Sequence, residues 1–227
     1  PRVLNIYENF PFWAVFFKEL GYSVKLSPLS SRSIYEKGIE SIPSESECYP
    51  SKLAHGHVQW LIDQGIKFIF YPSIIYERNE TPDANNHYNC PIVATYPENI
   101  KNNVEDLTRL NVRFDHPYFS MKDYRTFNNG LLRVFSKEYG IPGKKVSQAS
   151  LKAWNELLKA KSDIEAQGDK ALKWMETNNC QGIVLAGRPY HIDPEINHGV
   201  PELITSYNVA VLTEDSISEH GHVDRPL

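Results

Sequence analysis

The chain has 227 residues and a mass of 26.1 kDa, which is enough for one α/β domain together with part of a second. Hydrophobic residues make up 41% of it and charged residues 23%, a composition that excludes general disorder. The net charge of −4 excludes the basic surface typical of proteins that bind phosphate backbones, so we expect no nucleic-acid partner.

The apolar runs and the cysteines restrict the cellular setting. No apolar run approaches the roughly 20 residues that a spanning helix needs, and no signal-peptide pattern opens the chain. We therefore expect no membrane partner and a cytoplasmic location. Three cysteines, an odd number, do not form a disulfide framework and indicate free, catalytic or metal-bound thiols. Strand-like runs lie next to both ends, which suggests a piece excised from a longer polypeptide.

The first third of the chain alternates short apolar runs with longer amphipathic ones. This pattern predicts strands over residues 2–6, 22–26 and 66–71, and helices over residues 10–21, 30–38 and 50–64. A glycine at or directly after the end of each helical run is a C-terminal stop signal. Helices between strands indicate βαβ units with parallel strands.

The rest of the chain begins with a long polar segment, residues 72–90, which is typical of a functional loop. Further strands are predicted over residues 91–96, 182–189 and 209–213, and helices from Pro97 and over residues 120–139, 147–178 and 200–206. The GIPGKK segment at residues 140–145 lacks the glycine spacing and the Ser or Thr of a P-loop. We therefore predict no nucleotide site in this fragment.

Together these elements predict an α/β fold. Residues 1–119 would form a Rossmann-like parallel sheet with flanking helices, and residues 120–178 a helical segment. Residues 179–227 would be the start of a second α/β unit, truncated at its end. Ligands of open parallel sheets bind where chains leave the C-terminal ends of strands.

The predicted strand exits are polar and rich in arginine, histidine and carboxylates, over residues 7–10, 27–32, 72–79 and 187–199. Solvation explains any single loop equally well, but four such loops at one edge favour a binding site. In the last loop Arg188 is a candidate anion-binding residue, with His191 beside it. Asp193 is open to ligand binding or to an ordinary capping role.

Cys48 lies in the stretch PSESECYPSKLAHGH, residues 43–57. Pro50 favours a helix start that leaves Cys48 just before the first turn, where free amides and the helix dipole favour a thiolate. A capping box over residues 44–47 is the alternative, and it would draw Cys48 into the helix. Cys90 also precedes a proline, and a buried small hydrophobe is the competing interpretation of each cysteine.

Several side chains near Cys48 are candidate ligand-binding residues. Glu47 precedes it directly, and Lys52 and His55 share its face if the helix reaches back that far. A zinc site would recruit His55 and His57 together with both cysteines, although no paired CxxC spacing supports it.

Four long motifs point to a family: PRVLNIYENFPFW, PSESECYPSKLAHGH, YNCPIVATYPENIKNN and VLAGRPYHIDPEINHGVPELI. Over nearly the whole chain the sequence resembles the domain that follows the ATPase modules in large activase-related proteins of the 2-hydroxyacyl-CoA dehydratase system. The resemblance implies ATPase activator modules in the same full-length chain and an acyl-CoA or other small-molecule substrate. It also implies that Cys48 and Cys90 are ligands of a [4Fe–4S] cluster.

Ser73 departs from that family pattern, in which we expect a further cysteine after the FIFYP strand. Serine is a harder and poorer iron ligand than cysteine. The leading hypothesis is a redox domain supporting ATP-driven electron transfer, with Arg188 and His191 across the cleft from the cysteines. The alternatives are an interaction domain that has lost the cluster, to which Ser73 points, and a zinc-dependent hydrolase.

Overall fold

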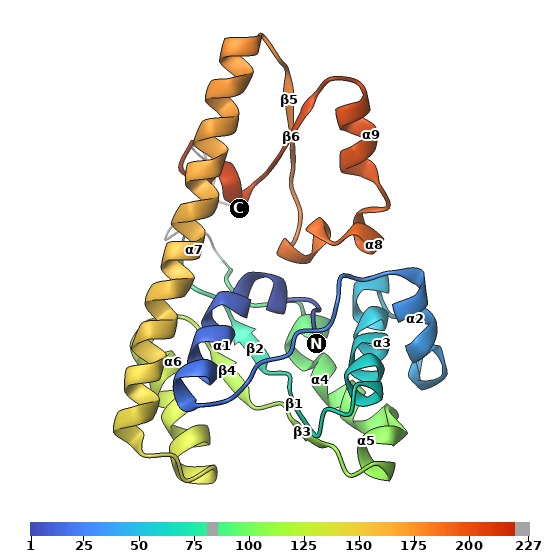
Figure 1. Cartoon of the computed structure of the whole chain (residues 1–227), viewed down its shortest axis with the longest axis vertical. Coiled ribbons are helices and arrows are strands. Elements are labelled where there is room, and N and C mark those ends of the chain that lie inside the picture. Colours follow the sequence, from blue (N-terminus) through green and yellow to red (C-terminus); the bar gives the residue numbers. More distant parts are fainter. Residues whose placement is uncertain (81–85, 221–227) are drawn as a thin grey trace.

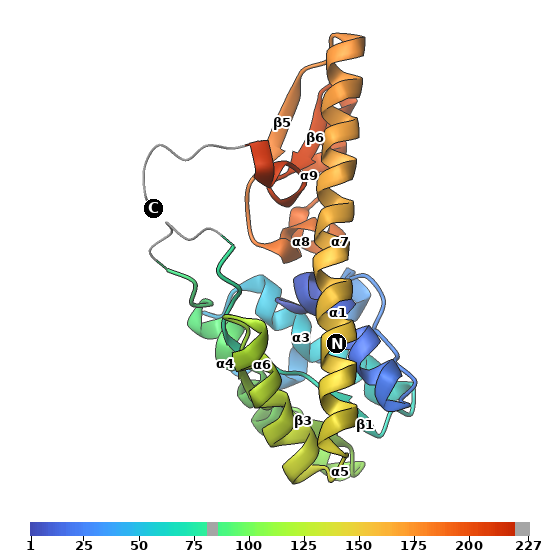
Figure 2. The same cartoon turned by 90° about the vertical axis from the view of Figure 1, so that its left-hand side faces the viewer.

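Helix α7 (Gly143–Asn178) runs along most of the molecule and connects a lower unit to an upper one (Figure 1). Figure 2 shows the same helix passing both units. The structure, a computed structural model, describes residues 1–80 and 86–220. None of the helices within these residues is both long and apolar enough to cross a membrane.

The lower unit contains most of the helices and two pairs of short strands. Its helices are α1 (Ile6–Leu20), α2 (Arg32–Gly38), α3 (Tyr49–Asp63), α4 (Pro91–Asn103), α5 (Glu105–Arg109) and α6 (Tyr124–Leu131). A 3₁₀ turn, η1 (Ile39–Ser41), follows α2, and a π-helical segment, η2 (Leu132–Glu138), follows α6. The strands are β1 (Phe68–Phe70), β2 (Ser73–Tyr76), β3 (Arg113–Asp115) and β4 (Tyr118–Ser120).

The strands of the lower unit form one interrupted parallel ribbon. Strand β1 pairs with β3 and β2 pairs with β4, both in parallel. Between the pairs, Tyr71 N–H donates to the Asp115 carbonyl at 2.9 Å and Ser73 N–H to the Pro117 carbonyl at 3.0 Å. Parallel strands require a crossover connection, which α4 and α5 supply here. The α/β class is therefore confirmed.

Two apolar cores hold the lower unit together. One gathers aromatic rings of α1, such as Phe12 and Phe16, with Phe127 of α6 and buried residues of α7. The other lies between α3, α4 and β1, with Val58 and Ile100 among its fully buried members. Burial of each such side chain contributes about 1.5–3 kcal/mol, so these cores hold the helices against the strands.

The upper unit consists of β5 (Gly182–Leu185) and β6 (Ala210–Thr213), paired in parallel, and the short helices between and after them. These are η3 (Pro189–Ile192), α8 (Pro194–Asn197), α9 (Val200–Ser206) and η4 (Asp215–His220). The segment η4 packs closely on α7, because a Cβ at Gly168 would lie 1.6 Å from the Ser216 carbonyl oxygen. The predicted strands and helix of this unit are confirmed.

Three predicted strands are wrong. Residues 2–5 and 22–26 are irregular, because the backbone N–H of Arg2 bonds the Ser27 hydroxyl at 2.7 Å and not a neighbouring strand. Residues 91–96 belong to helix α4, since Pro91 takes the first helical position and its fixed φ suits a helix start. Pro97 consequently lies inside α4 and does not begin a helix.

The predicted loop over residues 72–90 is also partly wrong, because strand β2 occupies its first part. Residues 81–85 of that segment, and residues 221–227 of the predicted second unit, lie outside the described residues.

Candidate functional site

Cys48 and Cys90 occupy the same position in two neighbouring helices. Cys48 is the N-cap residue of α3 and Cys90 that of α4, and each helix has a proline in its first turn. Cys48 is exposed, Cys90 is partly exposed, and neither is in a disulfide. The capping-box alternative, which drew Cys48 into a helix, and its interpretation as a buried hydrophobe are therefore both wrong.

Tyr190 of η3 lies within electrostatic range of both cysteines. Burial raises the pKa of the Tyr190 hydroxyl; Arg188 opposes this shift, and Cys48 and Cys90 both add to it. Both sulfurs are therefore near enough to act on one hydroxyl. Tyr190 and Cys90 also pack against the same apolar core. The upper unit thus places a phenol within electrostatic range of two thiols of the lower unit.

Two buried hydroxyls beside the cysteines lack hydrogen-bond partners. Tyr71 and Ser73 are fully buried, and neither side-chain oxygen has a partner in the described part of the chain. Burial raises the pKa of Tyr71, and Cys48 adds to the shift, which places the two groups close together. An unpaired buried hydroxyl costs about 1–3 kcal/mol, so such groups at a site suggest a missing ligand.

Asn89 brings the start of α4 next to β2. Its backbone N–H donates to the Ile75 carbonyl and its side-chain Nδ2 to the Ile74 carbonyl, both at 3.0 Å. Cys90 is the next residue, so its backbone lies beside the strand that Ser73 begins. These hydrogen bonds place the N-terminus of α4, and with it Cys90, next to the strand that contains Ser73.

This donor set fits part of the ligand shell of an iron–sulfur cluster. Two thiols lie at helix N-termini, which favour negative charge, and the Ser73 oxygen, which has no partner among the described residues, is a third potential ligand atom. Within residues 1–80 and 86–220, no three His, Cys, Asp or Glu side chains converge on a metal position. The described chain therefore offers two thiolates and an oxygen.

Glu47 and His55 form a buried network beside Cys48. The Tyr96 hydroxyl contacts the Glu47 carboxylate and lies 3.0 Å from His55 Nε2, while His55 Nδ1 lies 2.8 Å from the Ser41 hydroxyl. Burial lowers the pKa of His55 to about 4, so the ring is neutral at pH 7. Both residues therefore lie near Cys48 with their polar atoms already bonded.

Lys52 secures the loop before Cys48, because its Nζ donates to the Glu45 carbonyl at 2.7 Å. His57 lies deeper in the unit, with Nε2 at 2.9 Å from the Ser30 hydroxyl and Nδ1 at 2.8 Å from that of Ser27. Burial lowers its pKa to about 3. Since both His55 and His57 use both ring nitrogens, the zinc hypothesis lacks the histidine ligands that it requires.

The remaining predicted residues belong to the loop after β5. Asp193 is fully buried; its carboxylate accepts from Tyr7 and from the Ser30 N–H, and it caps α8. His191 Nδ1 accepts from the Arg188 N–H at 3.0 Å. Arg188, His191 and Tyr190 line a common cavity, so the structure brings these three together.

Tyr71 and Tyr190 are parts of the site that sequence reasoning missed. Tyr71 ends the predicted strand over residues 66–71, and Tyr190 follows the GRP turn of the last polar loop. The sequence feature that could have identified them is a tyrosine directly after a predicted strand, because ligands of parallel sheets bind at the C-terminal ends of the strands.

Comparisons with known proteins add one finding. A family model described as the CoA enzyme activase uncharacterised domain matches residues 1–217. No curated protein and no solved structure matches the chain. The matched residues include both cysteines and the loop that carries Tyr190. The chain therefore belongs to the family of CoA enzyme activase domains.

Proposed function

We propose that this domain binds an iron–sulfur cluster through Cys48 and Cys90 and relays electrons in a 2-hydroxyacyl-CoA dehydratase system. The observation that carries the proposal is the pairing of two free thiols, at the N-caps of adjacent helices, near one tyrosine hydroxyl. ATPase activator modules of a longer chain would supply the electrons in the cytoplasm, for an enzyme acting on an acyl-CoA or another small substrate. A bound cluster would supply one-electron transfer.

The residues of the chain would prepare the site in three ways. Cys48 and Cys90 would bind iron as thiolates, with the negative charge stabilised by two helix N-termini. Ser51 fixes Cys48, because its hydroxyl donates to the Cys48 carbonyl at 2.7 Å and lies 3.4 Å from its sulfur. The Tyr190 hydroxyl, with its raised pKa, keeps its proton and would donate a hydrogen bond to a nearby thiolate.

Anaerobic reconstitution with ferrous iron and sulfide tests this proposal. We expect bound iron and sulfide in whole-number ratio to the protein, with visible charge-transfer absorbance. Cys48→Ala and Cys90→Ala should each abolish both signals. Cys180→Ala is the matched control, since Cys180 precedes β5 in the upper unit and should leave iron binding unchanged.

One result would contradict the proposal: a folded protein that takes up no iron under strictly anaerobic conditions. Circular dichroism of each sample establishes folding, and preparation without oxygen removes cluster damage as an explanation. Iron uptake by the Cys48→Ala and Cys90→Ala variants equal to that of the wild-type protein would also contradict it, because iron would then be held elsewhere.

Ser73 favours a second candidate function, a non-catalytic domain that docks the activator modules to a partner. In this view the Ser73 hydroxyl stands where a metal-binding thiol would be, and the cysteines have kept only their helix-capping places. A folded, iron-free protein that still binds ATPase modules in pull-down assays would support this second function.

A further inference from the structure

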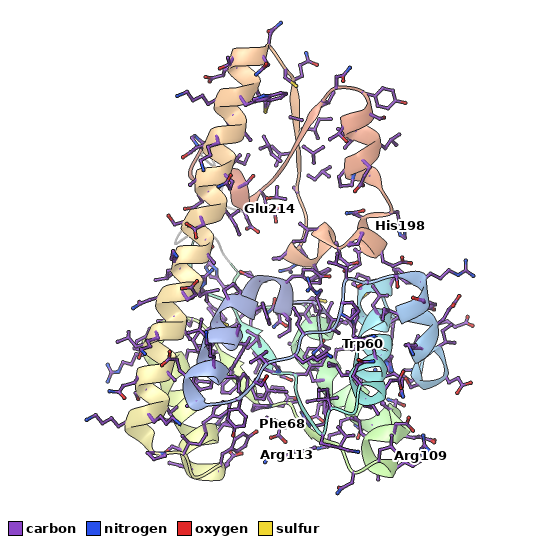
Figure 3. The ribbon with its side chains drawn as sticks, viewed as in Figure 1. Trp60, Phe68, Arg109, Arg113, His198 and Glu214 are labelled. Atoms are coloured by element: carbon purple, nitrogen blue, oxygen red, sulfur yellow. The ribbon has the colours of Figure 1, made fainter. Side chains whose placement is uncertain are left out.

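A second candidate site lies between the two units. A cavity of 570 Å³ is bounded by the start of α1, the end of β2, the segment before α4 and the loop after β5. Glu214, labelled in Figure 3, is part of its wall and belongs to the upper unit. A cavity of this size suits a small molecule rather than a polypeptide.

Asn5 gives the cavity an unpaired hydrogen-bonding group. Its side chain lines the cavity and only 4% of the residue is exposed, yet neither its amide oxygen nor its nitrogen has a partner among the described residues. The amide oxygen of Asn9, one helical turn further along α1, is also unpaired in that part of the chain. A ligand in the cavity would satisfy the amide of Asn5.

Besides Glu214, three carboxyl groups line the same cavity: Glu8 of α1, Glu77 after β2 and Asp215 of η4. Glu77 accepts from Asn89 Nδ2 at 2.7 Å and lies 3.5 Å from Asn9 Nδ2. Burial raises the pKa of all three, and for Glu8, where Glu77 is the next cause, the pKa is about 8. The cavity therefore holds carboxyl groups that are poorly solvated and repel one another.

The charged neighbours leave this excess of carboxyl groups unbalanced. Arg78 opposes the shifts: its Nη2 pairs with Glu80, which Lys161 also contacts at 2.5 Å, while its Nε and Nη1 have no partner among the described residues. The other titratable groups on the cavity walls or facing these carboxyls are His87, Arg188, His191, Glu214 and Glu165. Arg188 is exposed at the rim, so a positive charge inside the cavity would meet mostly carboxyl groups.

We propose that this cavity binds a small ligand through a primary ammonium group, held by Glu8, Glu77 and the amide oxygen of Asn5. An ammonium has three N–H donors, and these residues supply three acceptors on adjoining walls. The Tyr190 ring lines the same cavity and is an apolar surface that a cation tolerates well. The site needs no metal, so it can be tested apart from the proposed cluster, although Tyr190 borders both sites.

Three probes of matched size test the charge preference of the cavity: propylammonium, propionamide and propionate. Isothermal titration calorimetry of the metal-free protein, repeated in two buffers of different ionisation enthalpy, reports affinity and proton exchange together. We expect only propylammonium to bind, with release of a proton at pH 7. Below the pKa of Glu8, the affinity for propylammonium should rise by about tenfold for each unit by which the pH is raised, because Glu8 must lose its proton to pair with the cation.

Variants locate the binding to this cavity. Glu8→Gln and Glu77→Gln should each weaken propylammonium binding by about tenfold or more, and Glu8→Gln should reduce the proton release, to which Glu77 can also contribute. Glu36→Gln is the matched control, since Glu36 is exposed on α2 and pairs with Arg32. Cys48→Ala and Cys90→Ala should keep amine binding, which separates this site from the proposed iron site.

Several results would overturn the proposal. These are equal or tighter binding of propionate or propionamide, amine binding unchanged in both glutamine variants, and absence of binding by all three probes to the folded protein. Circular dichroism of each variant confirms folding before the titration. Glutamine has nearly the same shape as glutamate, and the two variants change different positions. If one variant fails to fold, the other still tests the proposal.

Discussion

The carboxylate of Asp193 accepts a hydrogen bond of 3.2 Å from the backbone N–H of Ser30, although 163 positions separate these residues in the chain. The Tyr7 hydroxyl donates to the same carboxylate oxygen, and the other oxygen accepts from the Glu195 N–H at 2.9 Å. Asp193 belongs to the upper unit, whereas Ser30 and Tyr7 belong to the lower one. This one carboxylate therefore helps to hold the loop that carries Tyr190 against the lower unit.

Asp193→Ala should destabilise the protein by about 3 kcal/mol, because it removes charge-assisted hydrogen bonds and leaves buried donors unpaired. Urea unfolding followed by circular dichroism measures the change. Asp163→Ala is the control, since Asp163 is exposed on α7 and should alter stability by less than about 0.5 kcal/mol. Equal stabilities of the two variants would show that Asp193 does not join the units.

Gly56→Ala should separate α2 from α3. A Cβ at Gly56 would lie 1.8 Å from the Ile34 carbonyl oxygen and 2.7 Å from the Ile34 carbonyl carbon, and these backbone atoms cannot move away as a flexible side chain can. We expect a loss of about 2 kcal/mol or more in unfolding free energy, together with weaker iron binding, because α3 carries Cys48. Gly143→Ala meets its nearest atoms at 3.4 Å and should be tolerated, so equal effects of the two changes would contradict this explanation.

Much of the fold could be predicted from local signals in the sequence. The glycine stop at Gly21, the serine cap at Ser31 and the proline at Pro50 each act on the backbone beside them, and the helices that they delimit are present. The predicted strand over residues 91–96 failed because its apolar residues also fit one face of a helix. The position of Pro91 after a capping residue decides between the two.

The candidate site was predicted only in part, because it depends on long-range packing. The two cysteines could be singled out by their prolines, but nothing local relates them to Tyr190. Glu77 lies in the predicted loop, and its partner Glu8 lies in the first predicted strand exit. Which strand exits meet is decided by the placement of α7 and the loop after β5, which the sequence pattern does not specify.

Stability should fall on both sides of neutral pH for different reasons. Burial holds the pKa of His55 at about 4 and of His57 at about 3, below the usual 6.5, so the unfolded chain binds more protons in acid. The pKa of Glu8, about 8, is raised from 4.5, so its contribution is complete in acid and is lost as pH rises through 8. Each proton difference changes stability by about 1.4 kcal/mol per pH unit.

Chemical denaturation between pH 3.5 and 9 measures both effects. Between pH 6.5 and 4.5 the carboxyls and histidines oppose each other, so the decline in acid should become steep below about pH 4.5. Glu8→Gln reduces the alkaline decline, because glutamine does not titrate while Glu77 and Asp215 still do, and it leaves the acid decline unchanged. A constant unfolding free energy across the range, or an alkaline decline unchanged in Glu8→Gln, would contradict the assigned pKa shifts.

Ser73 provides a test that depends on both burial and chemistry. Its hydroxyl is fully buried without a partner in the described residues, so Ser73→Ala should raise the stability of the metal-free protein by about 1 kcal/mol. Ser73→Cys adds a thiol of nearly the same size beside Cys90, and thiolates bind cluster iron far better than hydroxyls.

Iron analysis after anaerobic reconstitution should therefore rank the proteins as Ser73→Cys above wild type and wild type above Ser73→Ala. The matched comparison is with Ser150→Cys, which adds a thiol at another fully buried serine, on α7, whose hydroxyl has no partner in the described part of the chain. Equal iron retention by the Ser73→Cys and Ser150→Cys variants would place Ser73 outside the metal site. A selective gain at Ser73 would instead show that the start of β2 supplies the third side of the proposed iron site.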